Sequence, residues 1–278
     1  MGESVPLVIT GAGGRLGRLL RSLWPALPDD RLAPVWFARN QANPAILGWN
    51  MGVDPAPELP AGAVILHLAG SVVRLAEYRA SVTAVCDAAR HSGARHLFVA
   101  SSGAVYPPLG QDHHEDTPPA PATPYGCAKL EAEQAARAAM GEAGLTLLRI
   151  GNIAGADALL GGNATGQPVV LDPVAGQNGP QRSYIAPTVL AGVLFRLSVM
   201  AASGAKLPLI LNVAQPGQVA MGDLLDAAGR TWGFGPPRGG VLARLTLNCD
   251  RLAALMPLPA TSAPALVADL ALLAGRWP

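Results

Sequence analysis

Lysine is scarce in this sequence. Of its 20 basic residues only two are lysines, Lys129 and Lys206, and the remainder are arginines. Charged residues make up 14% of the chain and the formal net charge is +1, so we expect no broad attraction to nucleic acid or to an anionic membrane. Because arginine serves almost everywhere else, each lysine raises the question of whether an ammonium group is required for chemistry.

Cysteine and histidine are also few. The three cysteines, Cys86, Cys127 and Cys249, are odd in number and lack the spacing of metal ligands, which argues against a disulfide framework. Of the five histidines, His113 and His114 are adjacent in a polar, proline-rich stretch rather than at helical spacing. We therefore expect no metal site.

Targeting and membrane signals are missing as well. The N-terminus leads into a strand-like segment without a basic region or a signal-like apolar run. The most apolar later stretch, Thr188–Met200, contains Arg196 and is too short to span a bilayer. The sequence therefore predicts a cytoplasmic protein without a membrane partner.

Short apolar runs alternate with helical patterns along most of the chain. The run Ala63–Ala69 is apolar throughout, which favours a strand buried on both faces of a parallel sheet. We expect strands at 5–10, 35–38, 63–69, 97–101, 145–150 and 208–213, and helices at 16–23, 81–91, 125–140 and 188–200. This alternation predicts an α/β fold with a doubly wound parallel sheet.

A glycine-rich turn follows the first expected strand. The residues Thr10–Gly17 read TGAGGRLG and open a helix, so the glycines allow close approach of a pyrophosphate to the helix N-terminus. Strand before and helix after is the context that a dinucleotide-binding fingerprint requires. We predict a Rossmann-type domain in which the cofactor-binding residues of this turn are Gly11, Gly14, Arg15, Leu16 and Gly17.

The end of the second strand bears on the choice of cofactor. An NAD site usually has an acidic residue there for the ribose 2′-hydroxyl, but this chain reads Ala38-Arg39-Asn40. Arg39 could pair with the 2′-phosphate of NADP. The sequence favours NADP, and NAD stays open.

Tyr125 and Lys129 stand four residues apart at the start of an expected helix. This spacing places them on one face, where the ammonium of Lys129 is expected to lower the pKa of the Tyr125 phenol from about 10. Such a phenol could act as a general base. Ser101 and Ser102 end a preceding strand, where doubly wound sheets place ligand-binding groups; we interpret Ser102 as a donor to a substrate oxygen and Ser101 as a cap.

At this point the residues resemble one family. The segments TGAGGRLG (10–17), HLAG (67–70), SSGAVY (101–106), YGCAKLEAE (125–133) and LRIGNIAG (148–155) are similar to the extended short-chain dehydrogenases, the NAD(P)-dependent epimerase/dehydratase family. Weaker similarity continues through RSYIAPTVLA (182–191) to LNCDRLAALMPLP (247–259), so it runs along nearly the whole chain.

This resemblance implies roles for individual residues. Tyr125 would be the general acid/base, Lys129 would tune it and hold the cofactor ribose, and Ser102 would match the catalytic Ser/Thr. Leu68, Ala69 and Gly70 would pass beside the cofactor, and Asn50–Met51 would approach its adenine. Asn152, Arg182 and Arg238 would contact substrate, and a homodimer would form through the helices that carry Cys86 and Tyr125.

The resemblance also divides the chain. Residues 1–155 and 183–214 would form the dinucleotide-binding domain, and 156–182 with 215–278 a small C-terminal substrate-binding cap. A cap of this size weakens the case for a large nucleotide-sugar substrate.

Differences from the family pattern limit the reactions that the protein is expected to catalyse. Members that dehydrate a sugar carry an Asp-Glu pair after the catalytic Ser/Thr, whereas this chain has Gly103-Ala104, so that dehydration is not expected. The usual Asn of the preceding helix is replaced somewhere around Tyr78–Ala80, and the Asp pair after the RSYI segment is missing.

The resulting prediction is an NAD(P)-dependent oxidoreductase or epimerase. It would transfer hydride reversibly at a secondary alcohol or ketone of a sugar or nucleotide-sugar. Two alternatives remain, a dehydrogenase of a free sugar acid and a non-catalytic NADP-binding sensor.

Overall fold

A seven-stranded parallel sheet forms the centre of the computed structural model, which describes residues 4–27, 31–40, 43–71, 73–142, 144–161, 167–237 and 239–274. Arg238, a predicted substrate residue, lies outside the described residues. In spatial order the strands are β3 (Ile46–Gly48), β2 (Leu32–Ala38), β1 (Val5–Thr10), β4 (Val64–His67), β5 (His96–Ser102), β7 (Leu145–Ile150) and β12 (Ile210–Val213).

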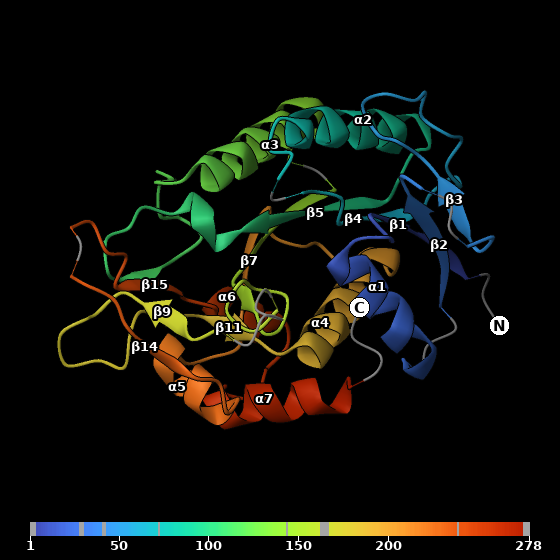
Figure 1. Ribbon diagram of the computed structural model, residues 1–278. Helices are drawn as coiled ribbons and strands as arrows, with labels where there is room; N and C mark the ends of the chain where they lie inside the picture. Colours follow the sequence, from blue (N-terminus) through green and yellow to red (C-terminus); the bar gives the residue numbers. More distant parts are fainter. Residues whose placement is uncertain are drawn as a thin grey trace.

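Helices cover both faces of this sheet, as Figure 1 shows. Helices α2 (Glu77–His91) and α3 (Pro124–Met140) pack side by side on one face, and α1 (Arg15–Leu23) and α4 (Pro187–Ala202) on the other. All four central strands are buried apart from their ends, which explains their continuous apolar runs. The predicted doubly wound α/β fold is confirmed.

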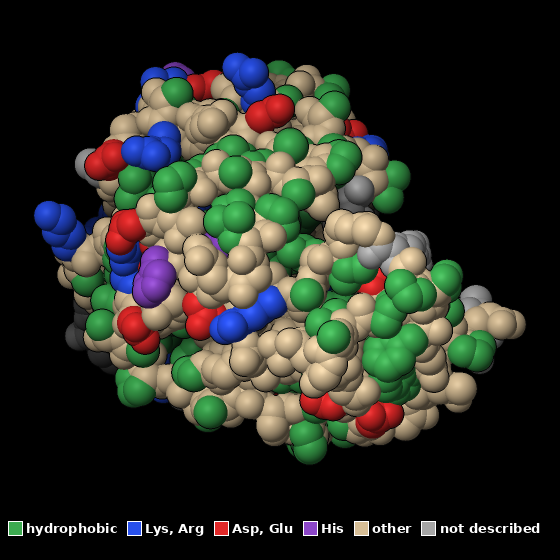
Figure 2. All heavy atoms as spheres, turned by 90° about the vertical axis from the view of Figure 1, so that its left-hand side faces the viewer, with side chains coloured by type: hydrophobic (Ala, Val, Ile, Leu, Met, Phe, Trp, Pro, Cys, Tyr) green, Lys and Arg blue, Asp and Glu red, His purple; other side chains and the backbone are tan. Residues whose placement is uncertain are grey.

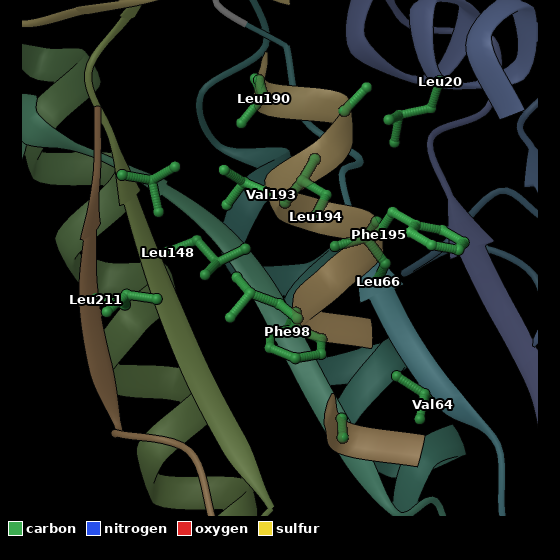
Figure 3. Close-up of a cluster of buried hydrophobic side chains, with 14 of the residues drawn as sticks. Leu20, Val64, Leu66, Phe98, Leu148, Leu190, Val193, Leu194, Phe195 and Leu211 are labelled. Carbon is green, nitrogen blue, oxygen red and sulfur yellow. The ribbon is translucent and has the colours of Figure 1, made fainter. Parts of the chain in front are cut away.

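The apolar contacts beneath the sheet come mainly from α4. Figure 3 shows Leu190, Val193 and Leu194 of this helix directed toward strand residues such as Leu66 and Phe98. All of these side chains are at most 1% exposed. The hydrophobic effect therefore fixes α4 against the centre of the sheet, although its sequence follows the less regular segment after Gly151.

The remaining residues form smaller units beside the sheet. A four-stranded sheet combines β6 (Asp112–His113), β10 (Gln181–Arg182), β13 (Val219–Ala220) and β15 (Arg244–Leu247), while β8 (Asn152–Ile153) pairs with β11 (Tyr184–Ile185) and β9 (Val169–Leu171) with β14 (Trp232–Phe234). Helices α5 (Met221–Ala227) and α7 (Ala263–Leu272) pack together below them. Helix α6 (Asp250–Leu255) instead packs against β12 through Leu252.

The surface on the side of these smaller units carries charges of both signs. In Figure 2, basic and acidic side chains are interspersed with hydrophobic ones across this face. Within the described residues, no helix is both long and apolar enough to cross a lipid bilayer.

Two elements differ from the sequence prediction in a way that matters for the site. Helix α2 begins at Glu77, four residues before the expected start at Ser81, because its first turn follows Ala76 without a side-chain cap and shows no apolar pattern. Strand β3 was not predicted, since three residues at a sheet edge are too short to show a periodicity.

Candidate active site

A pocket of about 370 Å³ opens where the strand order reverses, between β1 and β4. Ligands of doubly wound sheets bind at this point, outside the carboxyl ends of the strands. The lining comes from the glycine turn, the ends of β2 and β4, and the start of α2: Gly11, Gly13, Gly14, Ala38, Arg39, Asn40, Trp49, Met51, Leu68, Ala69, Gly70, Ser71, Arg74, Glu77, Tyr78 and Ser81.

The glycine turn is shaped by close backbone contacts. Gly11 has a φ of +81°, and a Cβ there would lie 2.7 Å from the backbone nitrogen of Ala69. Gly17 is buried where α1 passes over the turn, and a Cβ would lie 2.2 Å from the carbonyl oxygen of Gly11. Glycine at both positions allows the loop and helix to approach the pocket, as a dinucleotide-binding turn requires.

Helix α1 begins at this turn without a side-chain cap. Gly14 is its N-cap residue and lines the pocket, so the first amides of the helix are available to an anion such as a pyrophosphate. The other predicted residues point elsewhere. Arg15 donates to the carbonyl oxygen of Ala156 at 2.9 Å, and Leu16 packs on the sheet core.

Arg39 lies at the pocket, but it is already paired. Its guanidinium is 2.5 Å from a carboxylate oxygen of Glu77, and Arg74 approaches the other oxygen at 3.4 Å. All three residues also line a second depression together with Asn50 and Met51. The predicted 2′-phosphate ligand Arg39 is therefore one member of a cluster of two cations and one anion.

The pocket suits a dinucleotide by its shape and its donors. Glycines of the turn, the apolar side chains of Met51 and Ala38, and the segment Leu68, Ala69 and Gly70 all line it. Trp49 also lines it, and the indole Nε1 of this residue is buried without a hydrogen-bond partner. A ligand with polar ring atoms could satisfy that group.

Ser102 and Tyr125 meet beside this pocket. Ser102 ends β5, and Tyr125 stands in the first turn of α3, which Thr123 caps through the amide of Gly126. The Ser102 side chain lies close enough to the Tyr125 phenol to oppose the rise of its pKa. The Ser102 hydroxyl oxygen accepts from the amide of Ala104 at 3.2 Å, which fixes its position.

Lys129 is buried one turn further along α3. Its Nζ donates to the carbonyl oxygen of Ala100 at 2.8 Å and lies 4.1 Å from the ring centroid of Tyr78, but 5.9 Å from that of Tyr125. Burial lowers the pKa of Lys129 to about 8, and the charge of Glu133 opposes this shift.

The electrostatics of Tyr125 differ from the prediction. Burial raises the pKa of its phenol, and hydrogen bonds with Ser102 and Tyr78 oppose the increase without cancelling it. The expected lowering by Lys129 is not found, because the ammonium lies closer to Tyr78 and the phenol is removed from water.

Ser101 was interpreted as a cap, and this was wrong. It is buried and donates to a carboxylate oxygen of Glu133 at 2.5 Å, while that carboxylate accepts two hydrogen bonds from Arg149 at 3.0 and 2.7 Å. Ser101 thus belongs to this ion-pair network, whereas Ser102, the last residue of β5, lies near Tyr125 at the start of α3.

The predicted substrate residues are held apart from the pocket. Asn152 lies in β8, where it is paired in register with Tyr184 of β11. Arg182 lies in β10 and donates to the carbonyl oxygen of Gln181 at 2.8 Å. Neither residue lines the pocket formed by the glycine turn.

The sequence prediction missed three residues at the start of α2. Arg74 and Glu77 complete the cluster around Arg39, and Tyr78 contacts both Tyr125 and Lys129. The only sequence signal at this place was the departure from the family's Asn around Tyr78–Ala80, which marked the position without indicating the contacts.

Comparison with known proteins supports part of this description directly. The model of the NAD dependent epimerase/dehydratase family matches residues 67–168, which contain Ser102, Tyr125 and Lys129. No protein with a curated description matches the sequence.

Solved structures share the fold over nearly the whole chain. UDP-glucose 4-epimerase from Brucella ovis in complex with NAD has a TM-score of 0.75 at 17% identity, with 95% of this chain and 96% of that chain covered. MoeE5 in complex with UDP-glucuronic acid and NAD has 0.73 at 19%, covering 95% and 97%. DesIV, a dTDP-glucose 4,6-dehydratase from Streptomyces venezuelae, has 0.70 at 18%, covering 98% and 99%. The chain thus resembles the NAD-dependent epimerase/dehydratase family in sequence over residues 67–168 and in fold over nearly its whole length.

Proposed function

We propose that this protein is an NAD(P)-dependent oxidoreductase or epimerase that acts at a secondary alcohol or ketone of a sugar or nucleotide-sugar. The observation that carries the proposal is the convergence of Ser102, Tyr125 and Lys129 next to the pocket formed by the glycine turn at the switch point of the sheet. The UDP-glucuronic acid and UDP-glucose bound in the similar MoeE5 structures support the substrate class.

The glycine turn, the first amides of α1 and the residues Leu68, Ala69 and Gly70 would hold the dinucleotide. A bound nicotinamide would accept or supply the hydride. Tyr125 would exchange the proton of the substrate hydroxyl at its own phenol oxygen. Ser102 would donate a hydrogen bond to the same substrate oxygen, and the Lys129 ammonium would bind the ribose.

Two products are compatible with this chemistry. Release of a keto compound makes the protein a dehydrogenase or reductase, whereas return of the hydride to the opposite face makes it an epimerase. Dehydration is disfavoured, because Gly103 and Ala104 follow Ser102 and supply no second acid or base.

The activity is tested by incubating the protein with NAD or NADP and a panel of UDP-glucose, UDP-glucuronic acid and free sugar acids. A net change in absorbance of the reduced cofactor indicates oxidation or reduction, and interconversion of isomers without such a change indicates epimerisation. Tyr125→Phe is expected to lower kcat about 10²- to 10⁴-fold with cofactor affinity retained. A variant that kept wild-type activity would refute the catalytic assignment.

For the cofactor we propose a preference for NADP. Arg39 and Arg74 share the single carboxylate of Glu77, so the cluster carries a net positive charge that a 2′-phosphate would complement. Glu77 competes with that phosphate for Arg39.

Titrations of NADPH and NADH by fluorescence test the preference. Arg39→Ala is expected to weaken NADPH binding about tenfold and to leave NADH binding almost unchanged, because one charge-assisted contact is lost. Glu77→Gln is expected to strengthen NADPH binding. Arg90→Ala, in an ion pair with Asp87 at the far end of α2, is the matched control. Equal affinities in the wild type would contradict the preference.

The substrate side and the assembly follow from the resemblance to the family. We propose that Asn152 and Arg182 contact the substrate and that residues 156–182 and 215–278 contribute most of its binding region. We also propose a homodimer through α2 and α3, for which the family resemblance is the support.

A further inference from the structure

Tyr78 lies between the cofactor pocket and the catalytic centre. It lines the pocket, is 4% exposed and stands in the first turn of α2. Its ring also rests against Gly70, where a Cβ would lie 2.2 Å from the Tyr78 Cε1 atom. Only glycine at position 70 therefore leaves room for this ring.

The ring of Tyr78 is in contact with both catalytic groups of α3. The Lys129 Nζ is 4.1 Å from its centroid, within the range of a cation–π interaction. The ring of Tyr125 meets it edge to face, with centroids 6.2 Å apart and an interplanar angle of 73°. These ring contacts bring the two phenols and the ammonium together in one buried cluster.

We propose that Tyr78 is a positioning residue of the catalytic centre, which seats the Lys129 ammonium on its ring and donates a hydrogen bond from its hydroxyl to Tyr125. This inference rests on the proposed function and assigns a role to the residue that stands near the family's usual Asn.

The direction of the hydrogen bond follows from the charge on each phenol. A bond donated by Tyr78 stabilises the phenolate of Tyr125, and it lowers the pKa of Tyr125 while it raises that of Tyr78. Burial raises the pKa of Tyr78 further, so this residue keeps the proton that it donates. Tyr78 thus partly offsets the effect of burial on Tyr125.

Three other titratable groups lie around this pair. Lys129 faces both rings from α3, and Glu133, next to Lys129, is ion-paired with Arg149. His67 of β4 approaches Lys129 from the sheet, and burial lowers its pKa to about 3, so it stays neutral. His67 therefore does not shape the pH profile near neutrality, and the groups that do shape it are Lys129, whose pKa burial lowers to about 8, and at higher pH the two phenols.

The pH dependence of kcat and kcat/KM in Tyr78→Phe tests the hydrogen bond. This variant keeps the ring and removes the hydroxyl, so we expect the apparent pKa of the general base to rise and kcat at pH 7 to fall about tenfold, with KM almost unchanged. Tyr78→Leu also removes the aromatic ring that the Lys129 ammonium contacts, and its kcat is expected to fall about tenfold further. An unchanged apparent pKa in Tyr78→Phe would overturn the proposal.

A second measurement needs neither cofactor nor substrate. The chain has four tyrosines, so ionisation of the Tyr125 phenol can be isolated in the cofactor-free protein as the ultraviolet signal that Tyr125→Phe removes. We expect this step to move to higher pH in Tyr78→Phe and to stay in place in Tyr106→Phe, which loses a buried hydroxyl bonded to Asn212. A step that does not move in Tyr78→Phe contradicts the hydrogen bond.

The two measurements separate the present inference from the proposed function. If Tyr125→Phe keeps full activity, the proposed function fails. If Tyr125→Phe is inactive and Tyr78→Phe has wild-type pH profiles and ionisation, only the role of Tyr78 fails.

Discussion

The ammonium of Lys129 is 6% exposed and opposes folding at neutral pH. Burial lowers its pKa from 10.5 to about 8, so below pH 8 the folded state holds a charge that water would solvate better. Between about pH 8 and 10.5 the folded protein has lost this proton, while the unfolded chain still binds it. The penalty is therefore greatest below pH 8 and disappears as the pH rises through this window.

Lys129→Met tests this balance between stability and activity. We expect the variant to be inactive and yet more stable at pH 7, by up to about 3 kcal/mol, because an apolar chain of similar volume replaces a desolvated charge. Chemical unfolding at pH 7 and at pH 10 should show that its advantage shrinks at the higher pH. Lys206→Met, at an exposed position, is the control and should show neither effect. A destabilised Lys129→Met at pH 7 would contradict the argument.

At the scale of single residues, the sequence predicted contacts between residues that are close together in the chain. Tyr125 and Lys129 are one helical turn apart, so their spacing alone predicted a shared site. Glu77 and Tyr78 were not predicted, because their partners Arg39, Tyr125 and Lys129 are 38 or more positions away in the chain. Charges and burial created by such long-range contacts also explain why the direction of the Tyr125 pKa shift was wrong.

At the scale of elements, a buried ion pair connects α3 to β7. Glu133 and Arg149 are each 2% exposed, and Ser101 of β5 completes the hydrogen bonds of the carboxylate. Two desolvated charges are tolerated when each satisfies the other. This network fixes the helix that carries Tyr125 and Lys129 against two strands of the sheet.

Glu133→Gln should destabilise the protein by about 3–5 kcal/mol, because it leaves the guanidinium of Arg149 buried without a counter-charge. The measurement is the free energy of unfolding in urea. Glu131→Gln on the exposed side of the same helix is the control and should change this value by less than about 0.5 kcal/mol. Equal effects of the two substitutions would show that the ion pair does not hold α3 in place.

At the scale of the whole molecule, the pocket joins parts of the chain that are distant in sequence. Its lining comes from the turn after β1, the end of β2, the end of β4 and the start of α2. A ligand bound there contacts all of them at once, and any ligand that binds only the folded state stabilises it.

Saturating dinucleotide at about 100 times its Kd should therefore stabilise the fold by about 2.7 kcal/mol and raise Tm by roughly 5–10 °C. Differential scanning fluorimetry with the preferred cofactor measures this shift. Gly14→Val should abolish it, because its side chain would enter the pocket beside the first amides of α1, whereas Lys206→Ala should retain it. A Tm that does not respond to either dinucleotide would oppose the proposed cofactor site.

The sheet could be predicted from sequence better than the surrounding units. Continuous apolar runs and the glycine turn predicted buried strands in a doubly wound parallel sheet, and this fold is confirmed. The small sheets that include β6, β10, β13 and β15 contain strands of two to four residues, which are too short to produce a periodicity. Their pairing depends on contacts between segments up to about 130 residues apart.

Ser101 and Ser102 at the end of β5 serve different purposes. Ser101 stabilises the fold through Glu133, and Ser102 is proposed to act in catalysis. Both positions can be randomised in a library that is screened only for the amount of folded protein. Polar residues that fit the Glu133 carboxylate should then be enriched at position 101, while position 102 should accept wide variation. In a library screened for enzyme turnover, position 102 should tolerate few residues and position 101 should tolerate more. At the end of this strand, one residue is therefore constrained by folding and the next residue by catalysis.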